Sequence, residues 1–413
     1  MEYDNDLVRE AWLNFKTGDL TAARRYAERA LLVVDDTETK VKASFILSQV
    51  TDDPKEKRDL LETVLGYDPT HAEARRALAI LDGKLNPADI VNADNLPAQA
   101  TDPQNAQADR FTCPKCGARR VFAPDGKSLV CEHCGYNDSL ANNQRADEQD
   151  FFTAMATAKG HRTPVATQVF HCQGCGAEFV LAPDVISVTC AYCDSPHVVR
   201  LEESRELIEP EGILPHALTQ RQAVQALVKW VEQNKWKPER KVEIPRGAYI
   251  PAWTFDLGGA IHYTGYMTQP SSNPWDRSRQ PVVKVSEDEP VMVDNLLVPA
   301  SKKMKALFNG LLSTFDLSAL QPYDARFLAG WPAEIYNTPM AEASLEARSQ
   351  AFADYSQRIQ LKYEHLQDLS MSSAGMAVLS FKLVLLPVWM TKIAITGETR
   401  SILINGQSGK IMK

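Results

Sequence analysis

Hydrophobic positions recur at helical spacing through the first 85 residues. Leu7, Ala11 and Phe15 lie four residues apart, and Asp68-Pro69 interrupts the pattern before a last apolar series. Such spacing predicts amphipathic helices that each bury one face. The first helix is expected to end near Gly18, and four more are expected at 20–31, 40–50, 55–65 and 72–81.

This helical segment also repeats itself weakly every 34 residues, as when Gly18-Asp19 is aligned with Asp52-Asp53. That period is typical of tetratricopeptide repeats (TPRs), which are stacked helical hairpins. Residues 1–85 therefore resemble about two degenerate repeats with a capping helix. Arrays of this kind present a concave face to a protein partner. A helical cap packed against the rest of the chain is the alternative interpretation.

The C-terminal part, residues 210–413, mixes helical and strand periodicity. A helix is expected after Thr219, which is suited to cap its N-terminus. Alternating apolar positions at 248–255 and 260–267 predict a hairpin that turns at Gly258-Gly259. Further strands are expected at 282–285, 291–298, 377–386, 388–395 and 400–404, with helices at 302–312 and 340–366. This order predicts an α+β domain with a largely antiparallel sheet.

The eight cysteines form two copies of one pattern. Each copy has a CxxC pair, fourteen intervening residues and a second CxxC pair. Two pairs at this separation are the ligand spacing of a four-thiolate zinc ribbon. The predicted metal ligands are Cys113, Cys116, Cys131 and Cys134 in the first copy and Cys172, Cys175, Cys190 and Cys193 in the second.

Four thiolates favour Zn²⁺, and a closed shell leaves no place for water or substrate, so two structural zinc ions are expected. A disulfide framework would need an oxidising compartment, and the acidic first residues lack the apolar core of a secretory signal. A thioredoxin-like redox pair would not occur in duplicate ribbons. His133, His171 and His197 lie near the cysteines and are expected to be surface residues or hydrogen-bond partners.

The two copies match beyond their ligands at a constant offset of 59 residues, as Phe111 matches Phe170. Gly117, Gly135 and Gly176 each follow the last cysteine of a CxxC pair, where a positive φ is expected, and Asp194 stands in the fourth such place. We therefore expect two small β zinc ribbons. The predicted segments are a helical domain at 1–85, a flexible linker at 86–109, ribbons at 110–138 and 167–200, a connector at 139–166 and the α+β domain at 210–413.

The charge balance changes which partners are expected. The chain has 53 acidic and 45 basic residues, a net charge of −8. Duplex-binding surfaces are normally basic, and Arg119-Arg120 with Lys115 is a single small basic cluster, so nucleic acid is the disfavoured partner. The longest apolar run, 376–395, is interrupted by charges and proline, so no transmembrane segment is expected. These features predict a cytoplasmic protein, with peripheral membrane association left open.

A series of short segments resembles one bacterial protein family. In order, the chain contains YIPAWTFD at 249–256, LVPAS at 297–301, FDL at 315–317, QPY at 321–323, LAG at 328–330, LLPVW at 385–389 and NGQSGK at 405–410. Together they resemble bacterial zinc-ribbon proteins commonly labelled primosomal protein N′ or replication-restart helicase-like, over roughly residues 110–413. The resemblance implies a role in membrane stress or at the cell envelope.

The helicase label does not fit the residues. A helicase needs a phosphate-binding GxxxxGK[ST] loop, and Gly406-Gln-Ser-Gly409-Lys410 has the wrong glycine spacing. No nucleophile elbow or HExxH motif occurs, and no cysteine is left over, so we expect no enzymatic activity. The sequence favours a bacterial adaptor that binds proteins through the TPR-like segment and the ribbons. The alternatives are a nucleic-acid-binding ribbon protein of replication or transcription and an enzyme in the C-terminal domain.

Overall fold

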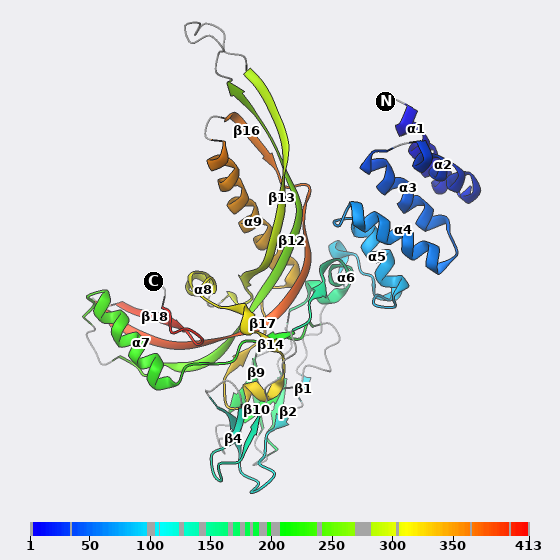
Figure 1. Ribbon diagram of the computed structural model, residues 1–413. Coiled ribbons are helices and arrows are strands. Elements are labelled where there is room, and N and C mark those ends of the chain that lie inside the picture. Colours follow the sequence, from blue (N-terminus) through cyan, green and yellow to red (C-terminus); the bar gives the residue numbers. More distant parts are fainter. Residues whose placement is uncertain are drawn as a thin grey trace, which may run out of the picture.

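The structure is a computed structural model of the 413-residue chain. It describes residues 3–33, 35–96, 104–106, 108–123, 128–139, 146–163, 168–173, 178–181, 185–189, 196–199, 207–237, 242–268, 282–302, 305–363, 366–395 and 398–411. Long curved strands form its centre, with the N-terminal helices beside them and the cysteine-rich segments at one end (Figure 1).

The predicted N-terminal helical segment is confirmed. It consists of α1 (Tyr3–Thr17), α2 (Leu20–Val33), α3 (Thr37–Val50), α4 (Pro54–Tyr67) and α5 (Ala72–Leu81). Small side chains let the first three helices approach closely, since Ala11, Ala23, Ala27 and Ala43 are fully buried between them. The side chain of Asp36 caps α3, and Asp53 with Pro54 begins α4.

The helical segment is joined to the rest of the chain through α6 (Phe151–Met155). Arg75 on α5 forms an ion pair with Asp150 at 3.0 Å and lies over the ring of Phe152. The backbone N–H of Val91 donates to the carbonyl of Ala156 at 2.9 Å. Part of the predicted linker is therefore packed on the connector, with short 3₁₀ turns η1 (Pro87–Asp89), η2 (Ala93–Asn95) and η3 (Ala158–His161) at this joint.

The large sheet is built on three long strands, β12 (Arg246–Thr268), β13 (Val282–Pro299) and β17 (Met376–Ile395). Strand β12 pairs with the other two in antiparallel fashion. Its odd-numbered side chains, such as Trp253, pack in one core, and its even-numbered ones, such as Ile250, pack in another. The strand is thus apolar on both faces in its N-terminal half.

The predicted hairpin at Gly258-Gly259 is wrong. Strand β12 runs through both glycines, and Gly259 pairs with Met376 on one side and Val291 on the other. Gly259 has φ +106°, and a Cβ there would lie 2.0 Å from the carbonyl oxygen of Gly375. The glycine therefore permits a close backbone approach inside a strand instead of a turn. The pairs of strands predicted at 282–298 and 377–395 are likewise single strands.

The sheet is largely antiparallel, as expected, but it also contains short parallel pairs, which make it a mixed sheet. Among the described strands, β11 (Gly212–Ile213) runs parallel to β17, and β15 (Ala333–Glu334) runs parallel to β12. The remaining strands of this C-terminal part are β14 (Gln321–Pro322), β16 (Leu366–Ser372) and β18 (Glu398–Asn405), all antiparallel to their partners.

Three helices cover the sheet. The side chain of Thr219 caps α7 (Gln220–Gln233) in a complete capping box with Gln222, which confirms the predicted start. Helix α9 (Met340–Lys362) buries an alanine-rich face on the Trp253 core. Leu311 and Leu312 of α8 (Lys305–Leu312) pack in the core on the other face. Short 3₁₀ turns η5 (Leu317–Ala319) and η6 (Ala325–Leu328) follow.

The cysteine-rich segments are joined to this framework. A small antiparallel sheet contains β3 (Arg120–Phe122), β4 (Ser128–Cys131) and β5 (Asn137–Ser139). A small mixed sheet contains β1 (Gln104–Ala106), which runs parallel to β7 (Gln168–His171), and β8 (Glu178–Leu181), which runs antiparallel to β7. The strands β9 (Val185–Thr189), β10 (Pro196–Val199) and β2 (Ala108–Arg110) extend the large sheet, because β9 pairs with β15. Strand β6 (Gln149–Asp150) pairs with β17.

Within the described ranges, every helix is too short or too polar to cross a bilayer.

Candidate metal centre

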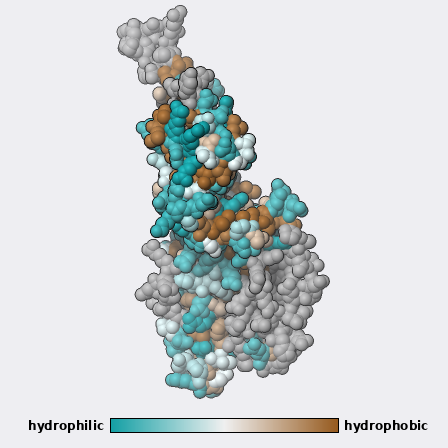
Figure 2. All heavy atoms as spheres, turned by 90° about the vertical axis from the view of Figure 1, so that its right-hand side faces the viewer, coloured by the Kyte–Doolittle hydropathy of each residue, from teal (hydrophilic) through white to brown (hydrophobic). Residues whose placement is uncertain are grey.

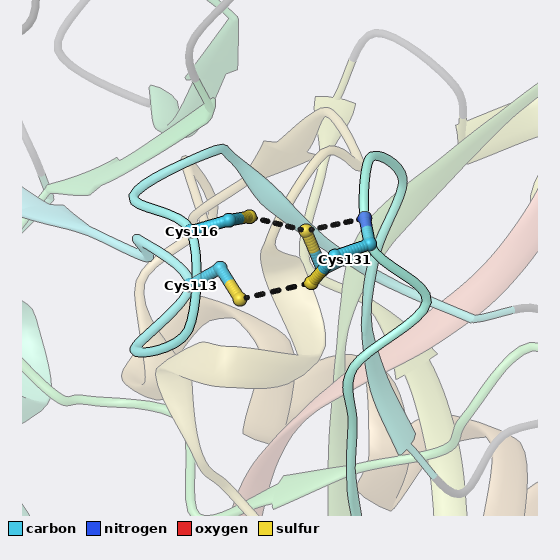
Figure 3. Close-up of side chains that lie close together, drawn as sticks. Cys113, Cys116 and Cys131 are labelled. Carbon is cyan, nitrogen blue, oxygen red and sulfur yellow. Dashed lines mark hydrogen bonds between the residues drawn. The ribbon is translucent and has the colours of Figure 1, made fainter.

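The first cysteine group forms a compact cluster at the ends of the small sheet. Cys113 and Cys116 precede β3, Cys131 ends β4 and Cys134 follows it. Their four Sγ atoms all lie within 4.8 Å of one another (Figure 3). The structure therefore brings together the four ligands predicted for the first ribbon, in an arrangement that could hold one metal ion.

The spacing between the sulfurs fits a small tetrahedral site. Sγ of Cys113 lies 3.6 Å from that of Cys134, and Sγ of Cys116 lies 3.5 Å from that of Cys131. A tetrahedron with Zn–S bonds of about 2.3 Å has sulfurs about 3.8 Å apart. Cys113 and Cys131 are buried, whereas Cys116 and Cys134 are exposed, so the cluster lies at the surface with an open side.

Both CxxC turns have the same backbone geometry. The N–H of Gly117 donates to the carbonyl of Cys113 at 2.9 Å, and that of Gly135 donates to Cys131 at 3.0 Å. The two glycines have φ values of +71° and +69°, which confirms the left-handed conformation expected there. Each turn directs backbone N–H groups at sulfur, and the N–H of Cys134 lies 3.5 Å from Sγ of Cys131.

These N–H groups change the acidity of the thiols. Hydrogen bonds from the backbone of Cys134 and His133 outweigh burial and lower the pKa of Cys131 to about 6. At Cys116 the amide of Ala118 favours the thiolate, but burial and the neighbouring cysteines raise the pKa to about 12. Four adjacent thiolates repel one another, so a bound cation is what would allow all four to ionise.

The small sheet is fastened to the C-terminal domain by one loop. The N–H of Phe122 donates to the carbonyl of Ala329 at 2.9 Å, and the indole N–H of Trp331 donates back to the carbonyl of Phe122 at 3.1 Å. The ring of Phe122 is buried against Phe327, with 4.9 Å between centroids. The neighbouring β9 is held by the same loop, since Oγ of Ser187 donates to the carbonyl of Leu328.

Trp331 also connects this loop to a buried histidine. It stacks on His216 at 4.2 Å between ring centroids, and His216 is fully buried. Burial lowers the pKa of His216 to about 3, so the ring is neutral. His216 therefore packs as a neutral ring among aromatic side chains.

The basic cluster of the first ribbon is largely neutralised. Arg119 pairs with Glu132 at 2.7 Å, and Arg120 pairs with Asp138 at 3.2 Å with only 14% of its side chain exposed. The ammonium group of Lys115 lies over the ring of Tyr136. Phosphate binding at the two arginines would have to displace these acidic partners.

Much of the second predicted ribbon lies outside the described residues, including Cys175, Cys190, Cys193, Gly176 and Asp194. Cys172 is described and fully buried, and its Sγ lies 3.3 Å from Nε2 of His197. His197 therefore contacts a predicted ligand, in keeping with its expected role as a hydrogen-bond partner.

The N-terminal helices contain a separate candidate site. A groove of about 540 Å³ is lined by Asp6, Val8, Arg9 and Trp12 of α1, Lys42, Phe45 and Ile46 of α3, and His71 before α5. Seen from the side of these helices, the described surface is largely hydrophilic with scattered hydrophobic patches (Figure 2). The groove combines apolar side chains with both signs of charge, which suits a peptide with mixed side chains.

The chain is similar to the uncharacterized protein YdjG of Bacillus subtilis (strain 168). The two are 23% identical over 323 residues, which are 73% of this chain and 88% of that protein. No family model matches the chain, and no solved structure matches it.

Proposed function

We propose that this protein is a non-enzymatic, zinc-binding adaptor that holds protein partners together. The N-terminal helices would act as a TPR-like binding module, and the ribbons would be rigid, zinc-stapled parts of the C-terminal scaffold. The observation that carries the proposal is the groove between α1, α3 and the residue that caps α5, because it offers binding chemistry on a part of the chain remote from the metal cluster.

Zinc is the metal proposed for the first cluster, in a structural role. Four sulfurs at tetrahedral spacing would fill all four positions around a zinc ion, which supports a structural role. The same motif repeat supports a second ion at Cys172, Cys175, Cys190 and Cys193. The ribbons' thiolates suit the reducing cytoplasm, where this adaptor is proposed to work in a membrane-stress or envelope system.

The groove has the features of a peptide-binding surface. Trp12 is 41% exposed and can lie against an apolar side chain of a partner. Arg9 forms an ion pair with Asp6 at 3.7 Å and Lys42 pairs with Glu38, so a charged side chain of a partner would exchange with these exposed pairs. The ring of Phe45 packs on His71 at 4.7 Å between centroids, which gives the groove an aromatic base.

Capture of partners by the purified full-length chain tests this proposal. Proteins from an extract of the host would be cross-linked and quantified by mass spectrometry for the parent, Lys42→Glu and Trp12→Ala. We expect a defined set of proteins whose recovery falls at least tenfold with either groove variant, equivalent to about 1.4 kcal/mol of binding.

The matched control is Arg29→Glu, which makes the same charge change on the exposed part of α2, outside the groove. It should retain every partner. Circular dichroism would show that all variants keep the helices. Equal recovery by the parent and both groove variants would refute partner binding through these helices.

A further inference from the structure

Three carboxylates from distant parts of the chain meet beside the large sheet. Glu148 precedes β6, Asp256 lies in β12 and Asp294 lies in β13. One oxygen from each lies within 4.8 Å of the others. More than a hundred residues separate Glu148 from Asp256 along the chain, so the fold alone brings them together.

The backbone around Asp256 is shaped to hold this arrangement. The pairing of β12 and β13 is irregular here, between the pairs of Phe255 and Leu257. Asn295 adopts φ +53°, and its N–H donates to Oδ1 of Asp256 at 2.7 Å. The amide side chain of Asn295 also donates to Oδ1 of Asp294 at 2.8 Å. One residue thus orients two of the three carboxylates.

The charges of the cluster are only partly compensated. Nζ of Lys382 lies 2.9 Å from Oε1 of Glu148, and its side chain is only 7% exposed. No ion pair joins Asp256 or Asp294 to a cation in the described part of the chain. Three carboxylates and one ammonium leave a formal charge of −2, which a divalent cation would balance. Burial raises the pKa of Asp256, and the nearby negative charge of Glu148 raises it further.

Neutral oxygens complete the surroundings. Thr254 is 1% exposed, and its Oγ1 has no hydrogen-bond partner in the described structure. It lies two residues before Asp256 on the same face of β12 and directly opposite Lys382 on β17. Oδ1 of Asn295 is also buried without a partner. Buried oxygens without donors are destabilising, and they are the ligands that hard cations take.

We propose that Glu148, Asp256 and Asp294 bind a hard divalent cation such as Ca²⁺ or Mg²⁺, with Thr254 and Asn295 as the nearby neutral oxygens. Glu148 and Asp294 are exposed, so an ion can reach the cluster from solvent, and Asp294 and Asn295 also line a groove of about 510 Å³. Because oxygen ligands select hard cations and thiolates select zinc, this site is chemically distinct from the cysteine cluster.

The site would join the connector to the sheet. Glu148 precedes the two residues of β6, which pair with Ser380 and Phe381 of β17. Asp256 and Asp294 belong to the other two long strands. A cation between them therefore links the segment that connects the cysteine groups to the strands at the centre of the molecule.

Titration of the full-length, zinc-replete protein with Ca²⁺ and with Mg²⁺ tests the proposal, by calorimetry and by thermal unfolding. No chelator is used, so the cysteine sites stay unchanged. We expect one ion per chain, a rise in Tm, and a dissociation constant weakened at least tenfold by Asp294→Asn. Native mass spectrometry would count the added ion separately from zinc.

Asp288→Asn is the control, because it removes the same charge from an exposed position on the same strand. It should bind the ion as the parent does. The proposal is overturned if neither ion binds up to about 10 mM, tenfold above the weakest usual Ca²⁺ sites. It is also overturned if Asp288→Asn weakens binding as much as Asp294→Asn.

Discussion

Glu211 shows how one partly buried carboxyl group couples the fold to pH. It lies beside β17, where its side chain accepts hydrogen bonds from the N–H of Leu383 and from the amide of Gln149. Burial raises its pKa to about 8, against an ordinary value of 4.5. The folded protein therefore keeps a proton between these pH values that the unfolded chain has lost.

Stability should fall as the pH rises through this window. Between about pH 4.5 and 8 the native state binds more protons than the unfolded state, so the free energy of unfolding decreases with pH by a few kcal/mol at most. Glu211→Gln keeps the shape and removes the titration. We expect urea unfolding at pH 5, 6.5 and 8 to show the variant gaining stability relative to the parent as pH increases.

Glu232→Gln is the matched control, since Glu232 is exposed on α7 and carries the same charge. Its stability relative to the parent should stay nearly constant with pH. Comparing each variant with the parent at the same pH cancels the pH dependence of the thiols. A constant difference for Glu211→Gln would show that this carboxyl group is ionised in the folded protein.

At the scale of elements, the loop at 327–334 joins several strands that are distant in sequence. It connects the small sheet, β9 and β12, and Trp331 is one of its links to Phe122. Removing the indole N–H of Trp331 leaves the buried carbonyl of Phe122 without this donor, at a cost of about 1–3 kcal/mol. The small sheet should then open more often.

The prediction is that Trp331→Phe speeds maleimide labelling of the buried Cys113 and Cys131 about tenfold, which corresponds to about 1.4 kcal/mol. Trp389→Phe is the control. Trp389 belongs to the same aromatic group, 5.5 Å from Trp331 between ring centroids, but its buried indole N–H has no partner in the described structure. Both variants should lose global stability. Equal acceleration in both would show that the Trp331 hydrogen bond does not hold the small sheet.

Local chemistry made some of these elements predictable. The five N-terminal helices, the cap at Thr219 and the glycine turns after Cys116 and Cys134 follow from residues close in sequence. The hairpin at Gly258-Gly259 failed because a glycine pair in a strand signals either a turn or a close backbone contact. Only the distant Gly375 decides between the two.

One candidate site could be predicted from the sequence and the other could not. The first four cysteines were found because their spacing alone encodes the cluster. Glu148, Asp256 and Asp294 were missed, since no local pattern relates residues brought together by the register of β6, β12, β13 and β17. The joining of β9 to the large sheet through β15 depends equally on long-range pairing.

At the scale of the whole molecule, the first cysteine cluster is attached to the large sheet. The ribbon was expected to be a separate module, yet the 327–334 loop joins its strand β3 to the large sheet. The N-terminal helices instead meet the remainder through a joint at Arg75, Asp150 and the turns around Val91. Metal binding should therefore stabilise the C-terminal domain more than the helices.

Hydrogen exchange on Cys131→Ser tests this distribution of stability. Ser cannot replace a thiolate ligand, so the variant should lose one equivalent of zinc by native mass spectrometry. Structural zinc supplies folding free energy directly, on the order of 10 kcal/mol in small peptide sites and less where a domain supports the fold. We expect faster exchange in β3, β4 and the 327–334 loop, with α2, α3 and α4 unchanged.

Glu132→Gln is the control, since it alters an exposed side chain between Cys131 and Cys134 and leaves every sulfur in place. It should keep its zinc and the exchange pattern of the parent. Faster exchange confined to β3 and β4 in Cys131→Ser would mean that the ribbon is an independent module after all. Unchanged zinc content would mean that this cluster holds no metal. We expect faster hydrogen exchange to extend through the 327–334 loop to β9 and β15, because this loop is hydrogen-bonded to both β3 and β9.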